Sequence, residues 1–306
     1  MEADIANIGP AGRKPSAEEA GYAAYAARRE AFVKSPGSDY VDQESQYVHP
    51  FRIFGNVWYV GGDWVCVHLV DTGDGLLLID SGNTGAAAML VNAIWEAGFR
   101  PADVKWIIHS HGHLDHIGAA GFFKRMFGTK LYLGAPDAEM FRSRPALSLI
   151  HCAHNAQEGL FTPDVEINDG DVLHLGGTTI QCRLVPGHTA GCVALFFNAH
   201  EGGETRRCGY YGGFGFNTLQ RAYLESNGFD VGKSRQIYLD SLAKVRGEKV
   251  EIFLGNHCDN NDTIGRRRKQ LANPDGPNPF IDPAAWGEYL DSRREALAAL
   301  CAADRR

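Results

Sequence analysis

Short runs of apolar residues, separated by turn residues, fill the chain from Phe51 onward. They predict β-strands, in chain order, at residues 51–54, 57–60, 64–70, 75–80 and 104–109. Apolar residues at helical spacing predict two helices, each ending before a glycine, at residues 85–97 and 118–127. The first half of the chain therefore combines strands and helices in one unit.

The second half repeats this succession. Further strands are predicted at residues 171–175, 178–185, 192–197, 207–211 and 250–254. Helical patterns cover residues 232–246 and 283–302. Strands in both halves, with helices between and after them, favour a layered α/β sandwich over a single meander.

Residues 1–48 are predicted to form an N-terminal arm, because Gly, Pro, Ser and charged residues dominate them. One helical stretch begins at Ser16, which matches a capping box together with Glu19. We expect this helix to pack on the main body, and a lid near the functional site is the alternative. Residues 49–306 are predicted to form a single main domain.

Composition narrows the choice of partners. The net charge of −7 leaves no broad basic face for a phosphate backbone, which disfavours nucleic acid and favours a small-molecule substrate. The seven cysteines include no C-x-x-C pair, so neither a disulfide framework nor a structural zinc knuckle is indicated. No leader pattern and no long apolar run is visible, so we expect a cytoplasmic protein that does not interact with membranes. Assembly into a homo-oligomer stays open.

Candidate metal chemistry is concentrated in residues 109–116, which read His-Ser-His-Gly-His-Leu-Asp-His. Random placement would rarely give the spacing H-x-H-x-D-H. His111 and His113 lie two apart in extended backbone and point to one side, while Asp115 and His116 can turn towards a second ion. Imidazole and carboxylate together suit zinc, although iron or manganese would accept them too.

Two more histidines follow predicted strands of the second half. His188 lies just after the strand that ends at Val185, and His257 lies just after the strand that ends at Leu254. In α/β folds, functional residues gather at the carboxyl ends of strands. We therefore predict six ligands shared by two ions, three each, so that each ion keeps an open position as catalytic sites do.

Residues 50–260, which contain these motifs, resemble the metallo-β-lactamase superfamily. Asp80, in Leu-Ile-Asp-Ser-Gly, resembles the aspartate of the first motif of that family. The resemblance implies an αββα sandwich with the site at one edge of the two sheets. It also implies that Asp80 supports the ligands from behind, that Asp115 orients a water shared by two zinc ions, and that this water becomes the nucleophile. The implied ligands are His111, His113 and His188 for one zinc and Asp115, His116 and His257 for the other.

Branches of the superfamily differ after the strand near residue 211. Glyoxalase II, the lactonases and the phosphodiesterases generally carry an aspartate there that bridges the two metals. One lactamase subclass carries a cysteine. In this chain residues 210–213 read Tyr-Tyr-Gly-Gly. The ligand set is therefore most similar to the metallo-β-lactamase subclass with His-His-His and Asp-His-His zinc sites. The serine-rich segment that binds the substrate carboxylate in those enzymes is not evident in residues 213–219.

The resulting prediction is a dinuclear zinc hydrolase that attacks the carbonyl of a cyclic, β-lactam-like amide, with Asp115 and His116 as catalytic residues. Ester, lactone or thioester hydrolysis by the same centre is the alternative. A mononuclear iron sulfur dioxygenase is less favoured, because such enzymes also use the bridging aspartate.

Other side chains are candidates for lesser roles. His109 is expected to be structural or to support the ligands. Asn217 and Tyr223 are candidate donors to a developing oxyanion, and His151 is a candidate substrate contact in a loop-like insertion. Cys258 is expected to be a buried thiol, because it points away from the direction of its neighbour His257 in extended chain.

Overall fold

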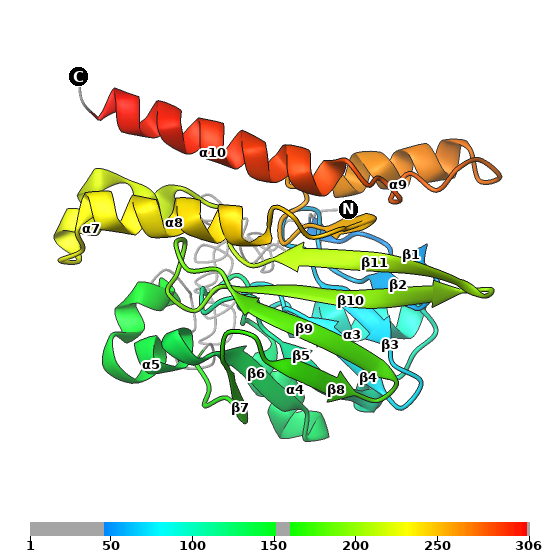
Figure 1. The fold of residues 1–306 in the computed structure, drawn as a ribbon. Helices are drawn as coiled ribbons and strands as arrows, with labels where there is room; N and C mark the ends of the chain where they lie inside the picture. The colour runs from blue at the N-terminus through cyan, green and yellow to red at the C-terminus, as the bar shows by residue number, and fades with distance from the viewer. Residues whose placement is uncertain (1–45, 151–159, 305–306) are drawn as a thin grey trace, which may run out of the picture.

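The structure is a computed structural model that describes residues 46–150 and 160–304 (Figure 1). Two β-sheets lie face to face. The first sheet follows chain order and contains β1 (Phe51–Phe54), β2 (Val57–Tyr59), β3 (His68–Asp71), β4 (Leu76–Ile79), β5 (Val104–Ile108), β6 (Lys130–Gly134) and β7 (Val165–Ile167). The second sheet has the spatial order β12 (Ile252–Leu254), β11 (Glu204–Tyr211), β10 (Val193–Glu201), β9 (Thr178–Leu184) and β8 (Val172–Leu175).

Helices accompany both sheets. Those in the first half are α3 (Ala87–Glu96), α4 (Ala120–Phe127) and α5 (Ala135–Ser143). Those in the second half are α7 (Arg221–Ser226), α8 (Val231–Val245), α9 (Thr263–Ala272) and α10 (Ala285–Ala303). In Figure 1, α8 and α10 run along the side of the second sheet that faces away from the first.

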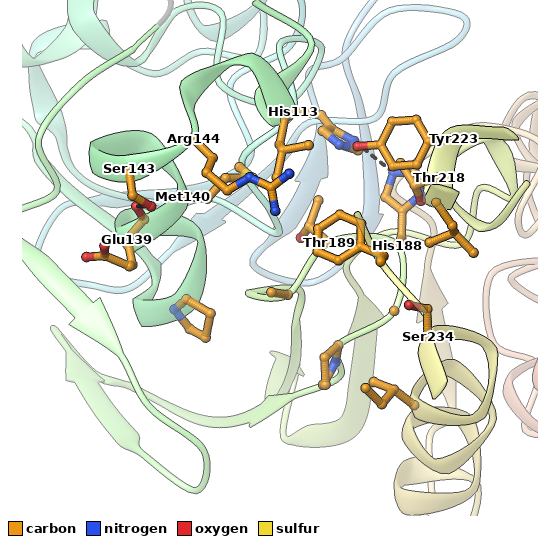
Figure 2. Close-up of a pocket in the computed structure, with 18 residues that line it drawn as sticks. His113, Glu139, Met140, Ser143, Arg144, His188, Thr189, Thr218, Tyr223 and Ser234 are labelled. Atoms are coloured by element: carbon orange, nitrogen blue, oxygen red, sulfur yellow. Dashed lines mark hydrogen bonds between the residues drawn. The ribbon is translucent and has the colours of Figure 1, made fainter. Parts of the chain in front are cut away.

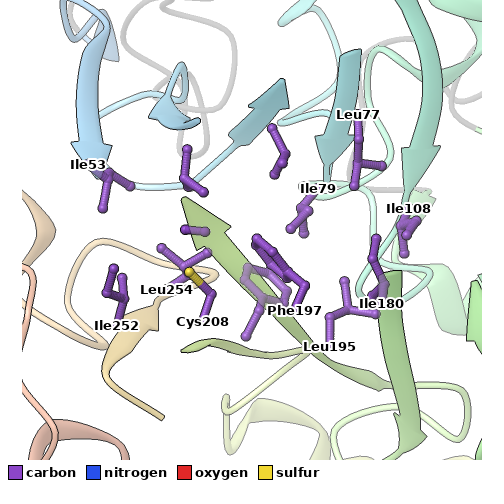
Figure 3. Packing of buried hydrophobic residues seen from close by; sticks show 14 of the residues in the cluster. Ile53, Leu77, Ile79, Ile108, Ile180, Leu195, Phe197, Cys208, Ile252 and Leu254 are labelled. Carbon is purple, nitrogen blue, oxygen red and sulfur yellow. The ribbon is translucent and has the colours of Figure 1, made fainter. Parts of the chain in front are cut away.

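Three clusters of buried apolar side chains separate the layers. The central cluster lies between the sheets (Figure 3) and includes Ile53, Leu77, Ile79 and Ile108 of the first sheet and Ile180, Leu195, Phe197, Cys208, Ile252 and Leu254 of the second. A second cluster packs the outer face of the first sheet against α3 and α4. A third packs the outer face of the second sheet against α8 and α10. The predicted αββα sandwich is therefore confirmed.

Strand β4 illustrates how the sequence specifies two buried faces. Its four residues are all buried, and successive side chains point to opposite sides of the sheet. Leu77 and Ile79 enter the central cluster, whereas Leu76 and Leu78 enter the cluster beneath α3 and α4. A continuous apolar run is typical of a strand covered on both faces.

Strand direction brings chemistry to one edge of the first sheet. Strands β4, β5, β6 and β7 run parallel to one another, so their carboxyl ends lie at the same edge. Asp80 directly follows β4, and His109 directly follows β5. Helix α5 starts at that edge too, directly after β6.

Some predicted elements differ from the structure. The strand predicted at residues 64–70 is wrong for its first part, because β3 begins only at His68. Val65 instead forms a bridge with His257, and the Cys66 N–H donates to Asn256 O, so this stretch joins the ligand loop of the second sheet. The elements β6, α5, β7 and α7 were not predicted.

The predicted helix from Ser16, most of the predicted arm and His151 lie outside the described residues. Among the helices of the described ranges, none combines the length and the apolar character that crossing a membrane requires.

Candidate metal centre

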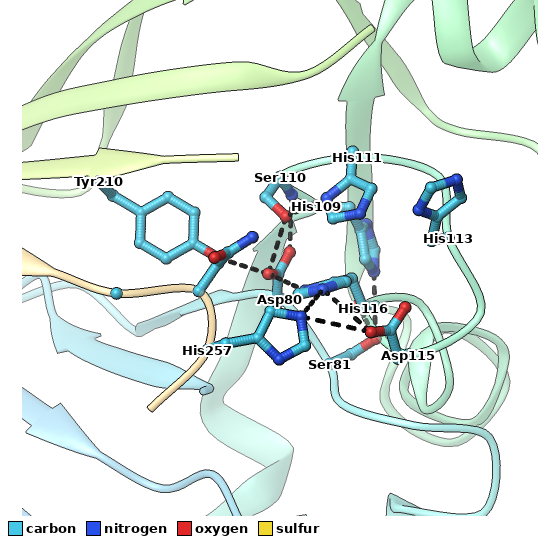
Figure 4. Close-up of polar contacts among 12 residues, drawn as sticks. Asp80, Ser81, His109, Ser110, His111, His113, Asp115, His116, Tyr210 and His257 are labelled. Atoms are coloured by element: carbon cyan, nitrogen blue, oxygen red, sulfur yellow. Dashed lines mark hydrogen bonds and ion pairs between the residues drawn. The ribbon is translucent and has the colours of Figure 1, made fainter. Parts of the chain in front are cut away.

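The loop of residues 109–116 connects the two sheets. It leaves the carboxyl end of β5, and its Ser110 N–H donates to the Asp80 carboxylate over 2.6 Å. The Ser110 carbonyl accepts a hydrogen bond of 2.9 Å from the N–H of Val193 in the second sheet. This double attachment fixes the ligand loop between the sheets (Figure 4).

The first ligand set consists of His111, His113 and His188. One donor atom from each lies within 4.8 Å of the others. The closest pair is His113 Nδ1 and His188 Nε2, at 2.9 Å. His111 Nε2 is buried without a hydrogen-bond partner in the described residues. Three neutral imidazoles with an orphaned buried nitrogen fit a bound cation.

The second set is a compact triangle formed by Asp115, His116 and His257. His116 Nε2 lies 3.2 Å from His257 Nε2, and Asp115 Oδ2 lies 3.4 Å from each of these nitrogens. Ligand atoms that lie about 2.0–2.1 Å from a tetrahedral zinc are separated from one another by roughly 3.3 Å. The triangle therefore has the dimensions of one face of a tetrahedral zinc site.

The protein holds the opposite ring nitrogens of three candidate ligands. His111 Nδ1 lies 2.9 Å from Ser110 Oγ, and His188 Nδ1 lies 2.8 Å from Gly215 O. His116 Nδ1 lies 2.7 Å from Asp80 Oδ2. Such contacts fix ring orientation and leave the other nitrogen for a metal.

Asp80 is a fully buried carboxylate in a dense set of donors. Its Oδ2 accepts from Ser110 Oγ at 2.8 Å and from the Tyr210 hydroxyl at 2.5 Å, as well as contacting His116. Burial opposes ionisation, but the charge of His116 and these hydrogen bonds outweigh it and lower the pKa of Asp80. Its backbone φ of 65° lies in the left-handed region, which aspartate tolerates better than most residues.

Burial and charge divide the histidines into two kinds. Burial lowers the pKa of His188 to about 4 and that of His111 well below its usual value, so both rings are neutral and ready to bind a metal. Burial also acts against the charged form of His116, yet the carboxylates of Asp115 and Asp80 raise its pKa to about 10. The two carboxylates therefore stabilise a positive charge at this position, and a bound metal cation could supply that charge in place of the proton.

Asp137, at the start of α5, was missed by the sequence interpretation. Its fully buried carboxylate accepts three hydrogen bonds of 2.7 Å, from the Gly112 N–H, the Thr189 hydroxyl and the Gly191 N–H. It thereby joins the His111–His113 segment to the loop of His188. The available signal was its position just after a parallel strand, but that strand had not been predicted.

The loop of His257 is fixed by its neighbours. Asn260 Oδ1 accepts from the His257 N–H over 3.1 Å, and His68 Nε2 lies 2.9 Å from Gly255 O. The Trp64 ring lies 5.1 Å from the His257 ring, centroid to centroid. His68 thus supports the loop that carries His257.

Two cavities meet at His113 and His188. The first, here called the polar cavity, has a volume of about 390 Å³ and is also lined by Trp64, Asp115, Asn217, Asn256, His257, Tyr289 and Arg293. The second, here called the apolar pocket, has a volume of about 330 Å³ and is also lined by Met140, Leu147, Tyr223, Leu224, Phe229 and Ile237 (Figure 2). The two oxyanion candidates are therefore separated: Asn217 lines the polar cavity and Tyr223 the apolar pocket.

The remaining candidates lie beside the ligands. His109 is fully buried, with Nε2 3.2 Å from Ser81 Oγ and Nδ1 3.1 Å from Tyr132 O, and burial lowers its pKa to about 4. Cys258 is buried and its Sγ contacts the Tyr59 hydroxyl at 3.2 Å and Cys66 Sγ at 3.8 Å, which accords with the expected buried thiol.

Comparison with known proteins identifies the family. Residues 65–201 match the sequence profile of the Metallo-beta-lactamase superfamily. A subclass B3 metallo-beta-lactamase of Bradyrhizobium japonicum is similar in structure, with a TM-score of 0.71 and 26% identity over 86% of this chain and 98% of that one. Residues 65–201 of the chain belong to the metallo-β-lactamase superfamily.

Curated proteins match shorter parts of the chain. A hydroxyacylglutathione hydrolase from Anaeromyxobacter dehalogenans is 30% identical over 128 residues, which are 42% of this chain and 40% of that protein. An N-acyl homoserine lactonase from Bacillus thuringiensis is 23% identical over 224 residues, which are 63% of this chain and 80% of that protein. The first of these matches thus spans less than half of the relative. Family and relatives together support a metal-dependent hydrolase.

Proposed function

We propose that this protein is a two-zinc hydrolase that opens a cyclic, β-lactam-like amide of a small molecule. The observation that carries the proposal is the triangle of Asp115, His116 and His257, whose donor atoms are 3.2–3.4 Å apart. The first ligand set adjoins this triangle, since a donor atom of His111 also lies within 4.8 Å of donor atoms of Asp115 and His116. Three protein ligands for each ion would leave positions for water and substrate.

Two zinc ions bound there would make water nucleophilic near neutral pH and polarise a carbonyl group. The described residues supply the orientation. Asp115 Oδ2 contacts His116 and His257, and Oδ1 can accept a hydrogen bond from a water in the polar cavity. Asn217 lines the same cavity, where its amide could donate to the oxygen of a carbonyl as negative charge develops.

Gly212 and Gly213 support the ligand assignment without a bridging carboxylate. A Cβ at Gly212 would lie 2.5 Å from Ser110 O, and a Cβ at Gly213 would lie 2.6 Å from His188 Cδ2. Gly213 also has a φ of +89°, which side chains with a Cβ rarely adopt. Neither position can therefore carry an aspartate without displacing the loop, which supports two ligand sets that share no carboxylate.

Ester or lactone hydrolysis is the second candidate. The likeness to the lactonase of Bacillus thuringiensis favours it, as does the apolar pocket beside His113 and His188, which would accept an aliphatic arm. The same centre would suit either carbonyl, so the substrate must be found by assay.

The test begins with metal content and a substrate panel. The zinc-loaded protein should contain about two metal ions, hydrolyse nitrocefin faster than an acyl-homoserine lactone or a thioester, and lose turnover with a chelator. His116→Ala should lower kcat/KM by more than the tenfold to hundredfold expected for a supporting residue, whereas the exposed His174→Ala should not. Full activity of His116→Ala, or full activity after metal removal, contradicts the proposal.

A further inference from the structure

The lining of the polar cavity includes a cation that the ligand sets do not explain. Apart from histidines, Arg293 of α10 is the one basic side chain among the described residues that line this cavity. The acidic lining residues are Asp115, which belongs to the ligand triangle, and Asp259. A positive charge in a substrate-sized cavity needs a physical reason.

The Arg293 guanidinium contacts two aromatic rings. Its guanidinium carbon lies 4.9 Å from the centroid of the Tyr289 ring and 5.6 Å from that of the Phe216 ring. Contacts at these distances hold a guanidinium in place while leaving N–H groups free to donate. The arginine head is therefore positioned rather than freely mobile.

Both rings are tied to metal ligands. Phe216 follows Gly215, whose carbonyl lies 2.8 Å from His188 Nδ1. The Tyr289 hydroxyl accepts a 2.9 Å hydrogen bond from Asn260, whose Oδ1 in turn accepts from the His257 N–H. The position of the guanidinium is thus fixed relative to His188 of the first set and His257 of the second set. A molecule bound at the metals would lie beside the guanidinium.

No carboxylate of the described residues satisfies Arg293. Its Nε is buried and has no hydrogen-bond partner among them, and it forms no ion pair with Asp259. Other arginines around α10 are paired: Arg246 lies 2.8 Å from Asp291, and Arg235 lies 2.5 Å from Asp304. Leaving a partly buried cation unpaired is costly, so a bound anion would complete the site.

We propose that Arg293 binds a carboxylate of the substrate, so that the preferred substrates are small carboxylic acids whose scissile carbonyl lies at the metal ligands. This rests on the proposed function, because the metals fix the other end of the molecule. A guanidinium binds a carboxylate through two parallel hydrogen bonds, which gives orientation as well as affinity. Neutral esters and lactones would not gain this contact.

The experiment uses two thiols that differ only in the anion, 3-mercaptopropanoate and 3-mercaptopropan-1-ol, with the thiol directed to the metals. Their dissociation constants for the zinc-loaded protein are measured by calorimetry. The acid should bind about tenfold to a hundredfold more tightly than the alcohol to the wild type. Arg293→Gln should abolish this preference, and Arg293→Lys should retain part of it.

The exposed neighbour Arg294 provides the matched control, since Arg294→Gln removes the same charge from the same helix. Its acid preference should equal that of the wild type. An acid that binds wild type no more tightly than the alcohol, or a preference lowered equally in both glutamine variants, overturns the proposal. If the panel shows no hydrolysis while Arg293→Gln still abolishes the preference, the anion site stands and the hydrolase assignment fails.

Discussion

At the scale of single residues, the centre depends on polar groups that are buried behind the ligands. Tyr210 is an example, because the sequence interpretation used it only as evidence that a bridging aspartate is missing. In the structure its hydroxyl donates to Asp80, which also contacts His116 (Figure 4). The ligand residues could be predicted from a local motif, whereas this contact joins positions 130 residues apart in the chain and could not.

His68 gives a prediction at the same scale. Burial lowers its pKa to about 4, although the hydrogen bond with Gly255 O and the charge of Asp80 act in the opposite direction. Because its ordinary value is 6.5, the unfolded chain binds a proton at this residue before the folded chain does. Stability is therefore lost as the pH falls from about 6.5 towards about 4, by about 3 kcal/mol in total.

His68→Gln should keep a donor to Gly255 O but remove the titration. Urea unfolding gives the free energy of unfolding of both zinc-loaded proteins at pH 7 and at pH 4.5. The change between the two pH values is then compared between wild type and variant. The wild type should lose more free energy of unfolding than the variant between the two pH values, while acid loss of metal is common to both. Equal losses would show that His68 is not held neutral by the fold.

At the scale of elements, prediction succeeded where a local pattern was strong. The apolar run of β4 and the helical spacing of α3 predicted both elements nearly to their ends. Strand β6 was missed because its five residues begin with an exposed lysine and end in a glycine. Val65 and Cys66 were taken for strand although they pair with the loop of His257, a contact that periodicity does not encode.

Asp137, at the start of α5, connects two loops of the candidate metal centre. Asp137 holds the His111–His113 segment and the His188 loop together through three donors, and a Cβ at Gly191 would lie 2.7 Å from its carboxylate carbon. Asp137→Asn would turn an NH₂ group towards one of these donors and leave it unpaired, which costs about 1–3 kcal/mol.

We expect Asp137→Asn to lower zinc affinity about tenfold to a hundredfold, because the two loops would no longer be fixed relative to each other. Competition with a metal-binding dye measures this directly. Glu139→Gln, which removes an exposed carboxylate from the same helix, should bind zinc as the wild type does. Unchanged zinc affinity in Asp137→Asn would mean that the loops are held by other contacts.

At the scale of the whole molecule, each ligand set joins the two sheets. His111 and His113 come from the loop after β5 in the first sheet, and His188 follows β9 in the second. Asp115 and His116 come from the same first-sheet loop, and the remaining ligand follows β12 in the second sheet. Bound metals would therefore act as two cross-links across the central apolar layer, and stability should depend on them.

Metal removal tests this dependence. A ligand that binds only the folded state stabilises it by about 4 kcal/mol at a thousand times its dissociation constant, which corresponds to a thermal midpoint on the order of 10 °C higher. Chelation should therefore lower the midpoint, and added zinc should restore it.

His188→Ala removes a cross-link, so it should melt below the wild type when zinc is present. After chelation the gap between the two proteins should narrow to the small cost of the lost side chain, because neither is then cross-linked. A gap that stays the same with and without zinc, measured by calorimetry, would mean that His188 stabilises the fold by packing alone and that the sheets are joined without metal.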